Sequence, residues 1–159
     1  MNLSLFFEAP DNLHDLAGPI YRQFCTFIRD ALSPFHLALK TQAVDGSFCD
    51  GQYNLAVGAR KVVGTAQAWR RINAKPIALI HAVMFIDILA DQLVDEANRI
   101  EVMLGSTKRY HRGTMTSIRA NVAPALQTDI ECLTIKAIAS FFNPKTQAGT
   151  ADCDRWLSG

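Results

Sequence analysis

The stretch GSFCDGQYNLAVGARKVVGTAQ, residues 46–67, contains the clearest folding signal in the chain. Its second half is typical of two apolar strands around a tight turn at Gly58, because glycine adopts a positive φ at little cost. Its first half is a loop in which two glycines flank Cys49. Since the hairpin folds back at Gly58, we expect Lys61, on the second strand, to approach the same pocket as Cys49.

A cysteine and a lysine at one pocket can act together in several ways. A neighbouring ammonium lowers the pKa of a thiol and so raises its thiolate fraction, which favours nucleophilic catalysis by Cys49. The Lys61 ammonium can instead bind the oxygen of an acyl carbonyl or a phosphate. The spacing alone favours a loop cysteine that only packs and a solvated lysine at a strand end over these chemical roles.

Outside residues 46–67, apolar periodicity predicts the flanking elements. We expect a strand over residues 3–7, then a helix to about Leu32 that Asp11 or Asn12 caps and Pro19 divides, and then an extended piece over residues 37–44. Residues 76–88 predict a strand buried on both faces, with a helix as the less favoured alternative. Two further helices are expected over residues 89–104 and 128–142. Gly105 is placed to end the helix over residues 89–104, and Thr128 and Glu131 have capping-box spacing. Together these elements predict one α+β domain over residues 1–142, followed by a polar tail over residues 143–159.

Composition excludes several classes of protein. The chain has 159 residues, 49% of them hydrophobic, and 16 basic residues balance 15 acidic ones, so neither a nucleic acid nor a membrane is an expected partner. It has no apolar run long enough to span a bilayer and no N-terminal leader pattern, which predicts a cytoplasmic protein. The four cysteines form no Cys-x-x-Cys pair and the histidines lack metal-like spacing, so we expect neither a disulfide framework nor a metal site. His81, on a predicted buried strand, is a candidate to orient Cys49 or an acceptor lysine.

The central stretch resembles the signature of the biotin and lipoate protein ligase superfamily, on its lipoate side. In that family a Cys-x-Gly-x-Tyr-(Asp/Asn)-Leu loop precedes a Gly-x-(Arg/Lys)-Lys-(Ile/Val)-x-Gly-x-x-Gln hairpin. The flanks NLSLFFEAPDNLHDL, IALIHAVMFID and EANRIEVMLGSTKRYHRGTMTSI are similar to the same family, so the resemblance covers about residues 2–140. It implies an α+β fold with a mixed, largely antiparallel sheet packed against helices.

The resemblance also implies an activity, namely attachment of a lipoyl or octanoyl group to a lysine of a lipoyl domain. The implied acceptors are the lipoyl domains of dehydrogenase complexes or the H protein of glycine cleavage. In octanoyltransferases and lipoyl amidotransferases the residue matching Cys49 carries the acyl group as a thioester, and the lysine matching Lys61 contacts that group. The positions lining the acyl pocket match Tyr53, Asn54, Gly64, Thr65 and Gln67.

One departure from the family leaves three hypotheses open. The family's catalytic domain carries an Arg-Arg-x-x-Gly-Gly segment before this stretch, and this chain has no Gly-Gly dipeptide, so we expect it to match the C-terminal portion of the domain. The first hypothesis is acyl transfer through Cys49, with acyl carrier protein or another lipoyl domain as donor. The second is lipoate ligation through an acyl-adenylate, which needs ATP and Mg²⁺. The third is a non-catalytic subunit that depends on a separate N-terminal half.

Overall fold

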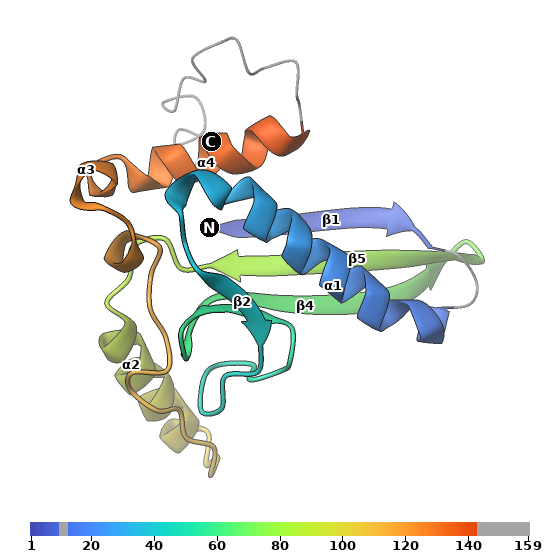
Figure 1. Cartoon of the computed structure of the whole chain (residues 1–159). Coiled ribbons are helices and arrows are strands. Elements are labelled where there is room, and N and C mark those ends of the chain that lie inside the picture. The colour runs from blue at the N-terminus through green and yellow to red at the C-terminus, as the bar shows by residue number, and fades with distance from the viewer. Residues whose placement is uncertain (10–12, 143–159) are drawn as a thin grey trace.

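The computed structural model describes residues 1–9 and 13–142, which form one antiparallel sheet and a layer of helices (Figure 1). The sheet has the strand order β1-β5-β4-β3-β2. Its strands are β1 (Asn2–Glu8), β2 (Leu39–Gln42), β3 (Asn54–Val57), β4 (Arg60–Ile72) and β5 (Lys75–Met84). Every strand pair is antiparallel, and the long β4–β5 hairpin forms the centre of the sheet. The α+β prediction with a largely antiparallel sheet is therefore confirmed.

The helices lie on one face of this sheet and beyond the end of its strands. They are α1 (Leu13–Ala31), α2 (Ala90–Met103), α3 (Pro124–Gln127) and α4 (Ile130–Phe142), with short 3-10 turns η1 (Ser33–Phe35) and η2 (Arg119–Asn121). α1 crosses the sheet diagonally, α4 lies beside its C-terminal part, and α2 stands beyond the end of the strands (Figure 1). The core between sheet and helices contains Ile28 and Leu32 against Leu55, Ile80 and Met84. Burial of these apolar side chains stabilises the two layers.

Several predicted elements are present in the structure. The first strand, the extended piece and the hairpin around Gly58 correspond to β1, β2 and β3–β4, and Gly58 has a φ of 60°. The strand over residues 76–88 corresponds to β5. Gly105 follows α2 with a φ of 70°, as a glycine that ends a helix does.

Other predictions from the sequence are wrong. Pro19 lies inside a continuous α1 and does not divide it, since a single proline withholds only one amide donor from a helix that packing on the sheet also stabilises. α4 begins at Ile130, after the unpredicted α3, and not at Thr128. Cys132 is disulfide-bonded, although no disulfide was expected. The predicted caps Asp11 and Asn12 and the tail over residues 143–159 lie outside the described residues.

β5 is buried on one face and not on both. Along β5 the buried residues alternate with half-buried or exposed ones, of which Val83 is 36% exposed. The cause is the single helical layer, because the side chains that alternate with the core residues point to the opposite side of the sheet. Among the described residues, no helix covers that side at β5.

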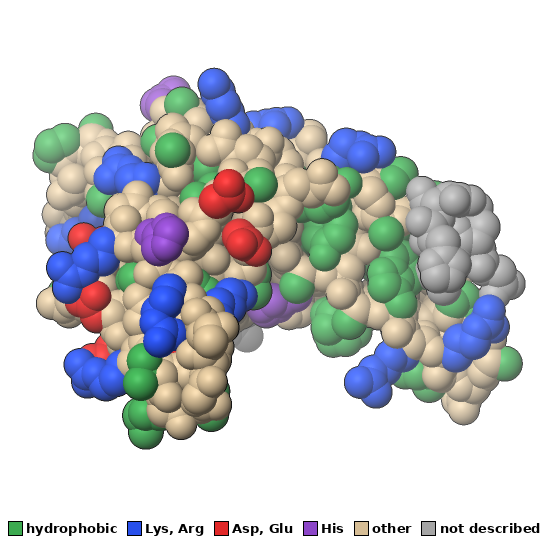
Figure 2. All heavy atoms as spheres, turned by 90° about the horizontal axis from the view of Figure 1, so that it is seen from below, with side chains coloured by type: hydrophobic (Ala, Val, Ile, Leu, Met, Phe, Trp, Pro, Cys, Tyr) green, Lys and Arg blue, Asp and Glu red, His purple; other side chains and the backbone are tan. Residues whose placement is uncertain are grey.

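We call this uncovered side of β1, β5 and β4 the open face. Strand register defines its rows as Asn2–Val83–Gly64, Ser4–His81–Ala66 and Phe6–Leu79–Ala68, because directly paired residues point to the same side. Figure 2 shows the molecule from below, with a hollow between two projecting parts and hydrophobic side chains gathered in it. The open face therefore combines the apolar Phe6, Leu79 and Val83 with the polar Asn2, Ser4 and His81, and no helix of the described residues covers it.

Candidate functional site

Lys61 is buried at the start of β4, with only 2% of its surface exposed. The β3–β4 register shifts between Leu55 and Ala56, so the regular alternation of side chains is interrupted there. Val62 and Val63 both join the core, and Lys61 is consequently directed to the same side of β4 as Gly64. A Cβ added at Gly64 would lie 2.8 Å from the Lys61 Cε and 2.9 Å from its Nζ. The ammonium therefore lies at one end of the open face, where a residue without a side chain makes room for it.

The Lys61 ammonium contacts the loop that carries Cys49. Its Nζ donates hydrogen bonds to the backbone carbonyl of Phe48 and, at 3.1 Å, to that of Cys49. Burial lowers the pKa of Lys61 below its ordinary value, and the nearby charges of Cys49 and Asp50 oppose that shift. A buried cation thus lies directly beneath a loop whose next residues present a thiol and a carboxylate to solvent.

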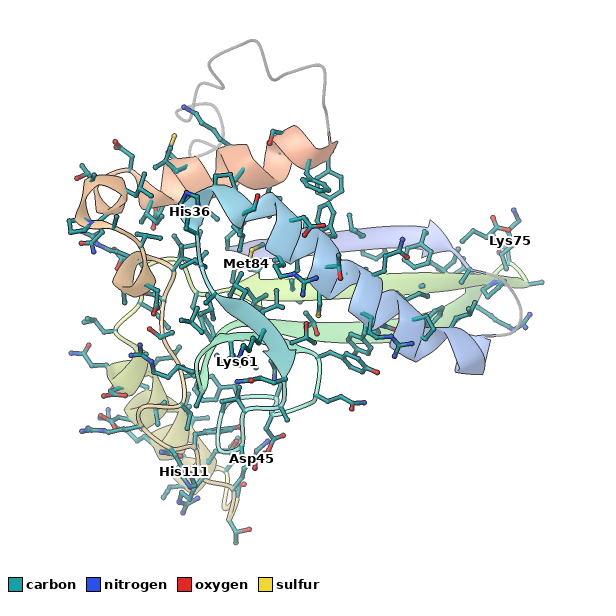
Figure 3. The ribbon with its side chains drawn as sticks, in the orientation of Figure 1. His36, Asp45, Lys61, Lys75, Met84 and His111 are labelled. Carbon is teal, nitrogen blue, oxygen red and sulfur yellow. The ribbon has the colours of Figure 1, made fainter. Side chains whose placement is uncertain are left out.

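The loop around Cys49 is fixed in an unusual backbone conformation. Cys49 is exposed and has a φ of 48°, in the left-handed region that non-glycine residues seldom adopt. The buried amide of Asn54 donates to the carbonyl of Cys49 at 3.1 Å and to that of Gly51 at 2.7 Å. Lys61 and Asn54 therefore hold the loop from below, and the Cys49 side chain faces outward (Figure 3 labels Lys61 at the start of β4).

The other predicted site residues lie on the α1 side of the sheet. Tyr53 stacks on Tyr21 of α1, with ring centroids 4.5 Å apart. The hydroxyl of Thr65 donates to the Tyr53 carbonyl, and the Gln67 amide donates to the carbonyl of Ala17 at 3.0 Å. A pocket of about 300 Å³ opens here, lined by Tyr21, Gly51, Gln52, Tyr53, Asn54 and Thr65. The structure thus brings Cys49, Asn54, Lys61 and Gly64 together and places Tyr53, Thr65 and Gln67 on the other side of β4.

The segment after α2, which resembles the family but to which the sequence assigned no site role, also forms a wall of the site. The ring of Tyr110 packs edge-on against Phe48 with centroids 4.5 Å apart, and the His111 amide donates to the Gly46 carbonyl at 2.8 Å. The same segment pairs with β4, because the Lys61 amide donates to the Thr114 carbonyl at 2.9 Å. No residue type in this segment indicates such a role, which depends on the path of the chain after α2.

α2 anchors this segment through Asn98. The side-chain amide of Asn98 donates to the Tyr110 carbonyl at 2.8 Å and accepts from the Tyr110 amide at 2.8 Å. The Tyr110 hydroxyl donates to Glu101 at 2.8 Å, and that hydrogen bond is the main cause that raises the pKa of Tyr110. Tyr110, which packs against Phe48 in the Cys49 loop, is therefore held in place at its backbone by Asn98 and at its hydroxyl by Glu101.

His81 lies on the open face and not beside the Cys49 loop. Its Nδ1 is 2.7 Å from the Ser4 hydroxyl on the neighbouring strand. Among residues 1–9 and 13–142, no group of three or more His, Cys, Asp or Glu side chains is arranged to hold a metal ion. Within the same ranges, no helix is long and apolar enough to cross a bilayer.

Comparison with known proteins shows which proteins the chain resembles. No family model matches the chain. It is 37% identical over 131 residues to an uncharacterized protein of Cupriavidus necator, covering 75% of this chain and 52% of that one. It is 32% identical over 85 residues to an octanoyl-GcvH:protein N-octanoyltransferase of Kyrpidia tusciae, covering 50% of this chain and 30% of that one. A transferase of the same name from Bacillus velezensis is 27% identical over 135 residues, covering 82% of this chain and 45% of that one.

Solved structures show the same fold. A T. acidophilum protein, described as a lipoate protein ligase with bound lipoic acid, matches 89% of this chain with a TM-score of 0.56 at 17% identity. Lipoate-protein ligase A bound with ATP matches 89% with a TM-score of 0.57 at 15% identity. In each case the match covers 51% of the solved chain, about half of its length. The chain also spans about half the length, or less, of the curated relatives it matches. The octanoyltransferase homologues and the lipoate-protein ligase fold neighbours together support a member of the lipoate/biotin ligase superfamily, matched over only part of its relatives' length.

Proposed function

We propose that the chain takes part in protein lipoylation, as an acyltransferase that moves an octanoyl or lipoyl group to the acceptor lysine of a lipoyl domain through a thioester on Cys49. The observation that carries the proposal is the pair of hydrogen bonds from the buried Lys61 ammonium to the Phe48 and Cys49 carbonyls. They fix a positive charge beside an exposed thiol. The octanoyltransferase relatives, whose names specify GcvH as the acyl carrier, support a lipoyl domain as partner.

The proposed reaction has two acyl-transfer steps. In the first, the Cys49 thiolate attacks the carbonyl carbon of the donor, the carbonyl oxygen becomes negatively charged, and the donor's thiol or amine leaves with a proton. In the second, the acceptor lysine attacks the thioester carbonyl, loses a proton and expels the Cys49 thiolate. Both steps pass through an oxyanion, and the Lys61 ammonium is the positive charge available to stabilise it.

The open face provides a surface for the acyl chain. Gly64, Ala66 and Ala68 present little or no side chain along β4, next to the Lys61 ammonium, while Phe6 and Leu79 on the neighbouring strands are apolar. An octanoyl or lipoyl chain that lies along this floor would remove apolar surface from water, and its carbonyl end would lie near Lys61.

ATP-dependent ligation is the alternative chemistry. The ATP-bound structure among the fold neighbours motivates it, and it needs Mg²⁺ and an acyl-adenylate that Lys61 binds. A ligase does not need an exposed thiol on a loop held in a left-handed conformation, so the arrangement at Cys49 favours the transferase.

Acylation of a purified lipoyl domain distinguishes the two functions. The assay supplies octanoyl-acyl carrier protein or octanoyl-GcvH in one arm and octanoate with ATP and Mg²⁺ in the other. The protein is tested alone and together with the part of the Cupriavidus necator relative that it does not match. We expect acylation in the first arm, with that part present, and its loss in Cys49→Ala.

Cys25→Ala is the matched control, because Cys25 is a free but buried thiol that donates to the Tyr53 carbonyl at 3.4 Å. It should keep the activity, whereas Cys49→Ala should not. Acylation that requires ATP and survives Cys49→Ala would instead assign the protein as a ligase. We further expect the chain alone to show neither reaction, because a floor without a facing wall does not hold the acyl chain in position.

A further inference from the structure

We propose that Tyr110 is a positioning residue of the site, because α2 fixes it in place and its ring keeps the Phe48 carbonyl on the Lys61 ammonium. Tyr110 is assigned an effect on the reaction through the Cys49 loop and no contact with substrate. The assignment rests on the proposed function, in which Cys49 and Lys61 carry out acyl transfer. Its structural part is testable without any substrate.

The support of the Cys49 loop from below is uneven along the loop. Asn54 donates to the carbonyls of Cys49 and Gly51, so its two hydrogen bonds lie at and after the cysteine. Before the cysteine, the carbonyl that is bound from below is that of Phe48, which accepts from the Lys61 ammonium. The position of Phe48 therefore decides whether the ammonium keeps that acceptor.

The segment after α2 holds the first half of the loop from the other side. The Tyr110 ring packs edge-on against Phe48, with centroids 4.5 Å apart. The next residue, His111, donates its amide to the Gly46 carbonyl at 2.8 Å, and a Cβ at Gly46 would lie 2.6 Å from Nδ1 of the His111 ring. This close approach, which only glycine permits, seats both residues of the segment directly on the loop.

α2 fixes Tyr110 through two of its side chains. Asn98 exchanges two hydrogen bonds with the Tyr110 backbone, each of 2.8 Å, and Glu101 accepts from the Tyr110 hydroxyl at 2.8 Å. Asn98 and Glu101 are three positions apart, so they lie on the same side of the helix. Because Tyr110 is held at both its backbone and its hydroxyl, its ring is a fixed stop for Phe48.

Cys49 needs such a stop because its backbone is strained. Its φ of 48° lies in the left-handed region, which a residue other than glycine keeps only when the surrounding contacts impose it. Without the Tyr110 ring, the residues before Cys49 can move and Cys49 can leave this conformation. The Lys61 ammonium then loses the carbonyl oxygens to which it donates. A displacement of about 1 Å at the reacting groups is enough to lower a rate by about 100-fold.

The titration of Lys61 tests this positioning on the chain as it is, without an acyl donor. Burial lowers the pKa of Lys61, and the charges of Cys49 and Asp50 oppose that shift. Opening the loop lets water reach the ammonium, so in Tyr110→Ala we expect the pKa of Lys61 to move up toward its ordinary value of 10.5. NMR signals of isotope-labelled lysine side chains follow the titration, and Lys61→Met assigns the signal of Lys61.

Two further variants show whether the effect is specific to the ring contact. Tyr110→Phe keeps the ring and the backbone pairing and loses the hydrogen bond to Glu101, so it should titrate close to the wild type. Phe27→Ala is the matched control, because Phe27 packs edge-on against Phe141 with centroids 4.9 Å apart, between α1 and α4. It should lower the free energy of unfolding and leave the titration of Lys61 unchanged.

Kinetics of acyl transfer, in the assay described above, test the effect on the reaction. Tyr110→Ala should lower kcat by about 100-fold and leave KM for the acceptor unchanged, because Tyr110 positions the catalytic groups and does not bind the acceptor. Tyr110→Phe should stay within about fivefold of the wild type, the usual effect of losing one hydrogen bond. Phe48→Ala should reproduce the loss, and the double variant should be no worse than either single one, since both remove the same contact. Phe48→Ala also takes the place of Tyr110→Ala if that variant does not fold.

The inference is wrong if Lys61 titrates at the same pH in Tyr110→Ala as in the wild type, or if Phe27→Ala shifts the titration equally. Additive losses in Tyr110→Ala and Phe48→Ala would also overturn it, because Tyr110 would then act by another route. A shifted titration in Tyr110→Ala, together with a wild type that never acylates a lipoyl domain, would contradict the proposed function and leave the placement of Lys61 by Tyr110 standing.

Discussion

The Nζ of Lys61 lies 3.1 Å from the carbonyl oxygen of Cys49, so the cation contacts the backbone of the residue whose thiol is exposed above it. A second hydrogen bond to the Phe48 carbonyl and the two bonds from Asn54 complete this support. Lys61 therefore has a structural role in the loop in addition to the catalytic role we propose, and the following variants separate the two.

Gly64→Ala should displace the Lys61 side chain. The added Cβ would lie 2.8 Å from Cε and 2.9 Å from Nζ, closer than side-chain atoms pack, so the lysine must leave its position. We expect a loss of about 1–3 kcal/mol in the free energy of unfolding and a loss of acyl transfer. Gly51→Ala is the control, since a Cβ there meets nothing within 4 Å. Equal unfolding midpoints for the two variants in urea would contradict this packing argument.

Lys61→Ala should reduce acyl transfer by about 100- to 1000-fold in the reconstituted protein, the usual effect of losing one preorganised donor at an oxyanion. Lys61→Arg keeps the charge but has a bulkier head beside Gly64, and we expect it to be impaired as well. Initial rates with a lipoyl-domain acceptor measure both. A Lys61→Ala protein that folds and retains the wild-type rate would exclude the proposed role of the ammonium.

Asn54→Ala should loosen the Cys49 loop. The substitution removes the donor that the Cys49 and Gly51 carbonyls share, and we expect it to lower the free energy of unfolding by about 1–3 kcal/mol. Gln42→Ala serves as the comparison, because Gln42 also donates to a backbone carbonyl, that of Gly58, but at an exposed site. Urea unfolding measures both variants, and an equal effect would show that the buried amide of Asn54 has no special role.

The pH dependence of stability should reveal the burial of Lys61. Its pKa in the folded protein is below the ordinary value of 10.5, so the folded state loses this proton at a lower pH than the unfolded chain does. Over that interval the unfolded state binds more protons, and stability rises with pH. The wild type should therefore gain stability relative to Lys61→Met as the pH is raised toward 10.5. A difference that is constant with pH, or that falls, in a series of urea titrations would contradict a lowered pKa.

The sequence predicted the secondary-structure elements of the site better than the face of the sheet to which each residue points. The turn at Gly58 and the strand pattern placed Lys61 on a hairpin next to the Cys49 loop, because glycine and apolar periodicity report local structure directly. They did not predict that Val62 and Val63 are both buried, since the shift in register between β3 and β4 depends on strand pairing. Tyr53, Thr65 and Gln67, which the resemblance assigned to the acyl pocket, lie toward α1, and their role in that pocket stays a prediction.

The exposed apolar surfaces could not be predicted from periodicity either. The apolar stripe of the helix predicted over residues 89–104, which includes Leu89, Ile100 and Leu104, is the clearest in the sequence, yet these three side chains on and beside α2 are exposed. A periodic pattern shows that a face is suited to burial, but it does not say which chain buries it. The same holds for Phe6 on the open face, which is 71% exposed.

The most direct test of the central claim is the mass of the reconstituted protein after incubation with octanoyl donor in the absence of acceptor. The account predicts an increase by one octanoyl group, located on Cys49 by peptide mapping, released by hydroxylamine and absent from Cys49→Ala. Transfer of that group to a lipoyl domain added afterwards should restore the original mass. A protein that acylates the lipoyl domain without ever carrying the group on Cys49, or that does so only with ATP and Mg²⁺, would contradict the account.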